Sequence, residues 1–194
     1  ATALAPIRAP QGVFAVFGNH DWRNDPAPKT GTDLPTIWHR AFAEAGVPVL
    51  SNAVLTLEAQ GVPFQLAGLE SQRAFKLRNP RRVRGADDLP AVMRKLDPSI
   101  FTLLMAHEPD VFPDLDETVD LTVSGHTHGG QIVPFGRPLI VPSRHGTRYA
   151  YGAFTEGRKH LVVSGGLGNT TLPFRIGRPP EIVLIDLMPT GNAA

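Results

Sequence analysis

The sequence predicts a mixed α/β fold, and three observations support this. Short apolar runs typical of strands outnumber segments with helical spacing. The two kinds of segment alternate along the chain, which favours sheets packed against helices. Of the 194 residues, 42% are hydrophobic, enough for a sizeable core. We therefore expect a single domain over residues 1–194.

The first half of the chain contains one segment with clear helical spacing. Apolar side chains recur every three or four residues from Leu34 to Ala45, and Gly46 ends the segment. Apolar runs on either side of it predict strands at residues 12–17, 47–50, 54–58 and 63–69. The last two should pair as a hairpin that turns at Gln60 and Gly61.

In the second half, a helix is expected from Asp87 to Leu96. Its acidic start and the basic residues near its end suit the helix dipole. Further strands are predicted at residues 100–106, 119–123, 161–163 and 182–185. Residues 134–152 are rich in proline and glycine, and we expect an irregular arm there.

Three of the predicted strands lead directly into turns that contain histidine. The turns are Gly18 to Asp21, His107, and Gly125 to Gln131. Imidazole is a good ligand for first-row metals, and glycines allow the backbone to approach a metal closely. Open α/β sheets place their sites at the carboxyl ends of strands, so we expect these turns to form one metal centre.

These turns resemble the last three motifs of the calcineurin-like metallophosphoesterases. The extended form from Gly125 to Gln131 is similar to the branch that includes the bacterial YkuE and YaeI phosphodiesterases. The tail shares that similarity, at residues 164–169, 173–175 and 180–182. The resemblance covers most of the chain and implies a four-layer α/β/β/α sandwich that hydrolyses phosphoesters with the help of metal ions.

The resemblance implies two divalent ions in the complete protein. Asn19, His107 and His126 would hold one ion, and His128 would hold the other. Manganese, iron and zinc all suit such nitrogen and oxygen ligands. Two ions about 3.5–4 Å apart would lower the pKa of bound water and relieve charge on the phosphoryl oxygens.

Other residues have expected roles toward the phosphate. By resemblance, His20 would steady the transition state or protonate the leaving oxygen. Asp21 would hold the other ring nitrogen of His20, or cap a turn, or do both. Arg175 is a candidate for binding phosphate. His145 lies in the loop after the double-histidine motif, and either substrate contact or an ordinary surface position suits it.

The first two motifs of the family, Asp-x-His and Gly-Asp, have no counterpart in this sequence. We therefore expect an N-terminally truncated domain that lacks its first strands, holds at most one ion and has little activity alone. The alternative is a non-catalytic short form that binds a phosphorylated ligand or an anionic membrane surface.

A basic stretch runs from Arg73 to Arg84 without an acidic residue. It is either a solvated loop or a peripheral membrane contact in which Phe75 and Leu77 enter the headgroup region. The resemblance to UDP-diacylglucosamine hydrolases makes a lipid-linked pyrophosphate a candidate substrate. A net charge of +1 and the lack of an aromatic-basic stripe argue against nucleic acid as partner.

The remaining features exclude some classes of site. The absence of cysteine excludes disulfides and thiolate metal sites. No apolar run approaches the ~20 residues of a transmembrane helix. The compartment stays open between bacterial cytoplasm and membrane association. We expect both His39, in the helical segment near Trp38, and His160, which follows the charged pair Arg158 and Lys159, at the surface.

Overall fold

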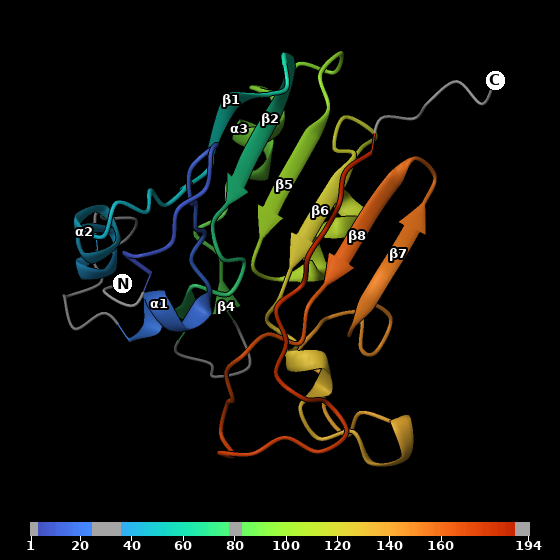
Figure 1. The fold of residues 1–194 in the computed structure, drawn as a ribbon. Helices are drawn as coiled ribbons and strands as arrows, with labels where there is room; N and C mark the ends of the chain where they lie inside the picture. Colours follow the sequence, from blue (N-terminus) through green and yellow to red (C-terminus); the bar gives the residue numbers. More distant parts are fainter. Residues whose placement is uncertain (1–3, 25–35, 78–82, 189–194) are drawn as a thin grey trace.

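The computed structural model describes residues 4–24, 36–77 and 83–188. It confirms the mixed α/β prediction: a six-stranded sheet in the order β1-β2-β5-β6-β8-β7 forms the centre (Figure 1). The strands of this sheet are β1 (Ala53–Ala59), β2 (Val62–Leu69), β5 (Thr102–Ala106), β6 (Leu121–Ser124), β7 (Gly152–Glu156) and β8 (Lys159–Val163). A separate ribbon pairs β3 (Phe75–Lys76) with β4 (Val83–Arg84).

The four central strands β2, β5, β6 and β8 run parallel, so their carboxyl ends share one edge of the sheet. The two outer strands β1 and β7 run antiparallel to their neighbours. The predicted hairpin β1–β2 is confirmed. Its turn residues Gln60 and Gly61 both have positive φ, at 55° and 79°, as a tight hairpin turn requires.

Helices lie beside and behind the sheet. The predicted first helix is confirmed as α2 (Ile37–Glu44), which Thr36 caps by accepting a hydrogen bond from the backbone of His39. Leu34 lies outside the described residues. α3 (Leu89–Met93) is shorter than predicted: Asp88 caps its start, and after Met93 the backbone forms tighter turns, in which Lys95 and Leu96 each donate to the carbonyl three residues earlier. None of the helices in the described part is long and apolar enough to span a membrane.

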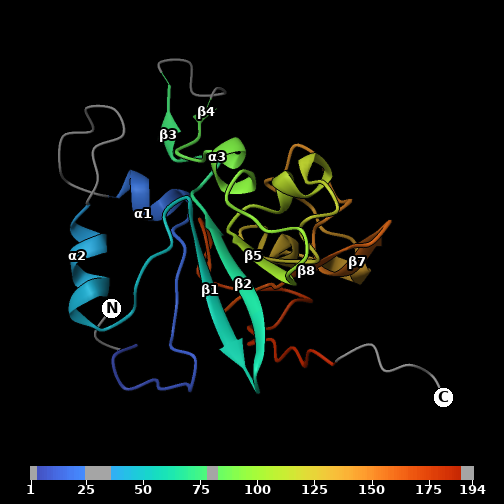
Figure 2. The same ribbon diagram turned by 90° about the horizontal axis from the view of Figure 1, so that it is seen from above.

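One core lies between the sheet and the elements that cover its rear face, α3 and the 3₁₀ helix η1 (Pro109–Asp114). The largest buried side chains there belong to Leu69, Leu104, Phe112, Tyr149 and Leu161. Figure 2 shows α3 on this face, whereas the C-terminal segment crosses the opposite face. Along β5, buried and half-buried side chains alternate, because only one face of the strand points into this core.

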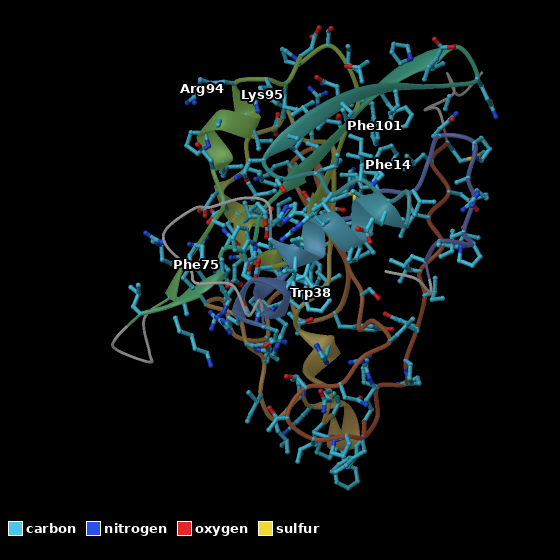
Figure 3. The ribbon with its side chains drawn as sticks, turned by 90° about the vertical axis from the view of Figure 1, so that its left-hand side faces the viewer. Phe14, Trp38, Phe75, Arg94, Lys95 and Phe101 are labelled. Atoms are coloured by element: carbon cyan, nitrogen blue, oxygen red, sulfur yellow. The ribbon has the colours of Figure 1, made fainter. Side chains whose placement is uncertain are left out.

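A second core joins the short helix α1 (Asn19–Arg23) to the ribbon and to α2. It consists of Phe17, Trp22, Ala74 and Phe75, with partly buried neighbours that include Trp38 (Figure 3). The prediction of an exposed His39 is wrong: its ring packs 4.5 Å from that of Phe17 and hydrogen-bonds to Ser51. The exposed position predicted for His160 is confirmed.

Three predicted strands are not formed, because a strand requires a neighbouring strand to pair with. Residues 182–185 are extended but unpaired in the described structure, and their side chains are exposed. Residues 12–17 and 47–50 do not form strands of a second sheet. They are joined by a single parallel bridge, between Ala15 and Val49. Conversely, β7 begins at Gly152, at the end of the predicted irregular arm, because β8 offers it an edge.

Candidate metal centre

The carboxyl edge of the sheet brings the predicted motifs together. β5 ends at Ala106 and places His107 at this edge, and β6 ends at Ser124 and leads into the double-histidine turn. The Gly18 motif arrives from a different direction, through the segment that bridges to Val49, and opens α1. Histidines from distant parts of the chain therefore meet where parallel sheets place their sites.

His107 lies directly against the backbone of Gly18. A Cβ atom on Gly18 would be 2.5 Å from Nε2 of His107, so any larger residue would displace the ring. Burial, reinforced by the charges of the other histidines, lowers the pKa of His107 to about 3. The ring is therefore neutral near pH 7, as a metal ligand must be.

His126 is held by two hydrogen-bonding groups. Its Nε2 atom lies 3.0 Å from the carbonyl oxygen of Pro142, which only accepts hydrogen bonds, so Nε2 carries the proton. Its Nδ1 atom lies 3.1 Å from Oδ1 of Asn19. Burial lowers the pKa of His126 to about 4, so Nδ1 is unprotonated near pH 7. Two lone pairs thus face each other, and a cation between them would satisfy both.

The backbone of the double-histidine turn is strained, and this strained conformation directs both histidine side chains toward the cavity. His126 and His128 have φ values of 66° and 52°, a left-handed region that side chains with a Cβ rarely adopt. Thr127 anchors the turn by donating to the carbonyl of Ala150. The Nδ1 atom of His128 is buried without a hydrogen-bond partner, so it too is available to an ion.

The motifs line a cavity of about 550 Å³. Its polar wall includes the histidines together with Arg23 and Arg73. Its apolar wall comes from two arms, the first arm (residues 132–142) and the second arm (residues 167–177), which project from the lower end of the molecule in Figure 1. The arm residues that line the cavity are the apolar Ile132, Leu139, Ile140, Pro142 and Leu172, together with Thr170 and Thr171.

Gln131, the last residue of the extended motif, joins the two arms. Its amide nitrogen donates to the carbonyls of Thr170, Leu172 and Phe174, and its oxygen accepts from the backbone of Thr170. A parallel bridge between Ile132 and Ile176 continues the connection. The motif therefore fixes the apolar wall as well as the histidines.

His20 is exposed and lines the cavity, in a position to face a bound phosphate. Asp21 caps the start of α1 by accepting a hydrogen bond from the backbone of Gly18 at 2.8 Å. Within the described part of the chain, the expected hydrogen bond from a ring nitrogen of His20 to the carboxylate of Asp21 is not formed. Burial raises the pKa of Asp21, although the bond from Gly18 opposes this shift.

The two candidates for substrate contact are not among the residues that line the cavity. Arg175 donates to the carbonyls of Gly165 and Gly168 and so holds the base of the second arm. Its charge lies close enough to help lower the pKa of His128, although burial is the larger cause. His145 packs edge-on against Tyr149, with ring centres 5.5 Å apart, and is not among the residues that line the cavity.

Comparison with known proteins identifies the family. The model of the calcineurin-like phosphoesterase family matches residues 2–130. The chain belongs to this family. The metallophosphoesterase YkuE of Bacillus subtilis, whose function is uncharacterised, is 34% identical over 190 residues, which cover 96% of this chain and 60% of YkuE.

Other relatives agree. An uncharacterised metallophosphoesterase of Helicobacter pylori strain J99 is 31% identical, over 98% of this chain and 46% of its own length. Phosphodiesterase YaeI of Escherichia coli is 29% identical, over 95% of this chain and 62% of YaeI. The chain thus spans about half to three fifths of the length of these relatives. No solved structure matches it significantly.

Sequence reasoning missed one acidic residue near the centre. Glu108 is buried, and its Oε1 atom lies 4.0 Å from Nδ1 of His126. With His107 and His126 it forms a group that could hold a metal ion. Its oxygens already accept hydrogen bonds from Ser71 and the backbone of Gln72, and burial raises its pKa to about 7. In the sequence, only its position immediately after His107 indicated that Glu108 could belong to the site.

Proposed function

We propose that this metallophosphoesterase hydrolyses a phosphodiester and that Asn19, His107, His126 and His128 hold its divalent ions. The observation that carries the proposal is the pair of facing lone pairs on His126 Nδ1 and Asn19 Oδ1. A cation bound by both atoms would satisfy both lone pairs. The lowered pKa values of His107 and His126 support it, because neutral imidazoles bind metals.

The chain's own residues then position the substrate. His20 faces the cavity and would donate a proton to the leaving oxygen. Asp21 fixes the backbone from which His20 projects, by holding the first turn of α1. When bound, the metal ions would supply an activated water and relieve phosphoryl charge.

We infer that this chain supplies part of the site and holds at most one ion by itself. All four proposed ligands are neutral, so they do little to offset the repulsion between two dications. The acidic neighbour Glu108 already has two hydrogen-bond donors on its carboxylate. By the family resemblance, a bridging carboxylate from an Asp-x-His or Gly-Asp motif would complete the centre.

The two arms favour a substrate with an apolar leaving group, such as a lipid-linked pyrophosphate. Such a substrate would be presented at an anionic membrane. Seven large apolar side chains of the arms are exposed, and neither arm contains an acidic residue. They are Phe135, Leu139, Ile140, Leu167, Leu172, Phe174 and Ile176. Apolar side chains beside cations suit a surface of anionic lipid.

The basic stretch from Arg73 to Arg84 is less suited to membrane contact than the arms. Phe75 is buried in the second core and cannot enter the headgroup region. Arg73 lines the cavity, and Arg84 stacks on the ring of Phe75. Leu77 is exposed, and Arg78, Arg81 and Arg82 lie outside the described residues.

Titration with Mn²⁺ in a calorimeter, followed by an assay with bis(4-nitrophenyl) phosphate, tests the metal centre. We expect the 194-residue chain to bind one ion weakly and to hydrolyse little. His126→Ala should abolish binding, whereas the exposed control His160→Ala should not. Two tightly bound ions with robust turnover would contradict the partial site. Binding of phosphorylated ligands by a chain that binds no Mn²⁺ at all would favour the non-catalytic alternative.

Sedimentation with vesicles tests the lipid proposal. The double variant Leu139→Ser, Ile140→Ser should bind phosphatidylglycerol vesicles at least about tenfold more weakly than the wild type, because each apolar side chain contributes to insertion. Leu55→Ser, an exposed leucine on β1, is the matched control. Equal binding by all three proteins would refute membrane contact through the arms.

A further inference from the structure

Two arginines share the polar wall of the cavity. Arg23 extends from α1, and Arg73 follows β2 at the same carboxyl edge that holds the histidines. The Nη2 atom of Arg23 donates to the backbone carbonyl of Arg73 at 2.6 Å, which fixes the two residues side by side. Both positive charges lie close enough to His126 to lower its pKa further, after the larger effect of burial.

In the described part of the chain, neither guanidinium forms an ion pair with a carboxylate. The nearby carboxylates have other partners: Asp21 accepts from Gly18, Glu70 from Trp22, and Glu108 from Ser71. The Nε atom of Arg23 is buried without a hydrogen-bond partner. Burial is the main cause that lowers the pKa of Arg23, the adjacent Arg73 adds to it, and the nearby Glu108 only partly opposes the shift.

We propose that Arg23 and Arg73 form a phosphoryl-binding subsite beside the metal centre. Guanidinium groups bind the non-bridging oxygens of phosphate in a bidentate manner, and an anion here would compensate both charges. Arg73 is free to do this, since no side-chain hydrogen bond engages its guanidinium among the described residues. The subsite rests on the proposed function, because the anion it holds is a phosphoryl group of substrate or product.

Calorimetric titration of the 194-residue chain with inorganic phosphate tests the subsite, first in chelator and then with Mn²⁺. We expect Arg73→Gln and Arg23→Gln to weaken phosphate binding at least about tenfold in both conditions, because each loses charge-assisted hydrogen bonds. Arg94→Gln is the matched control, an exposed arginine at the end of α3 far from the arms (Figure 3). It should bind like the wild type.

Arg73→Gln is the decisive variant, because Arg23 also holds the backbone of Arg73 and its loss could loosen the loop. Unchanged far-ultraviolet circular dichroism and Tm will show that each variant is folded. Phosphate binding by Arg73→Gln that equals the wild type would overturn the subsite, as would a wild type that binds no phosphate in either condition.

A comparison of pyrophosphate binding with phosphate binding identifies which phosphoryl group of the substrate the arginines hold. With Mn²⁺ present, a preference for pyrophosphate that Arg73→Gln removes would assign them to a second phosphoryl group of the substrate. Equal binding of both anions would assign them to a single one. The measurement in chelator also separates this inference from the proposed function: arginine-dependent phosphate binding by a chain that binds no Mn²⁺ would reject the proposed metal centre and keep the subsite.

Discussion

The Nδ1 atom of His126 lies 3.1 Å from the Oδ1 atom of Asn19, although 107 residues separate them in the chain. The other ring nitrogen of His126 is held by the carbonyl of Pro142, at the base of the first arm. The imidazole thus connects the end of a parallel strand, the start of α1 and an arm. Because the carbonyl fixes the tautomer, the ring presents a lone pair to the amide oxygen.

This relationship predicts that Asn19 governs metal affinity. Asn19→Ala should lower the affinity for Mn²⁺ at least tenfold, since outer-shell partners alone commonly contribute about 10–100-fold. Calorimetric titration measures the change. Asn24→Ala, an exposed asparagine at the end of the same helix, should leave the affinity unchanged. If both variants bind Mn²⁺ as the wild type does, Asn19 is not a ligand.

The close approach of Gly18 to His107 predicts different effects of two glycine substitutions. Gly18→Ala should force His107 out of position, weaken Mn²⁺ binding and destabilise the protein by about 1–3 kcal/mol. Gly125→Ala should do neither, because a Cβ there meets no atom within 4 Å. Thermal unfolding and metal titration on both variants check this. Equal losses would mean that crowding at His107 is not the cause.

The hydrogen bonds of Gln131 predict that this side chain holds the second arm. Gln131→Ala should raise the hydrogen-exchange rate of backbone amides across residues 170–174 and leave the central strands protected. Mass spectrometry after exchange in D₂O measures this. Gln11→Ala, in which an exposed glutamine loses its bond to the carbonyl of Glu58, should not affect the arm. An unchanged exchange rate would show that backbone contacts alone hold the arm.

The hydrogen bond of Tyr149 predicts a loss of stability at alkaline pH. Its hydroxyl donates to Glu156 at 2.6 Å, and burial is the main cause that raises its pKa to about 12. Below pH 10 the bond is intact, so Tyr149→Phe should cost about 1 kcal/mol of unfolding free energy. Between pH 10 and 12 only the unfolded wild type loses the proton, so its advantage should shrink. A constant difference measured by urea unfolding across this range would contradict the assignment.

The sequence predicted elements well where local pattern and pairing agree. Helix α2 and the hairpin turn at Gln60 and Gly61 depend only on residues close together in the chain, so both were predicted correctly. Residues 182–185 have the composition of a strand and yet lack an edge in the described structure. The pattern records an intrinsic preference, whereas a strand exists only when another strand satisfies its backbone groups.

By itself, the sequence determined the family, the mixed α/β class and the histidine motifs at the ends of strands, because these depend on residue type and short spacing. Only the tertiary structure decided which groups meet. It placed Asn19 against His126, Glu108 near His107 and His126, and Arg23 beside Arg73. Such pairings arise from the order of strands and the paths of loops, which no local pattern encodes, so the charge and shape of the cavity emerge only on folding.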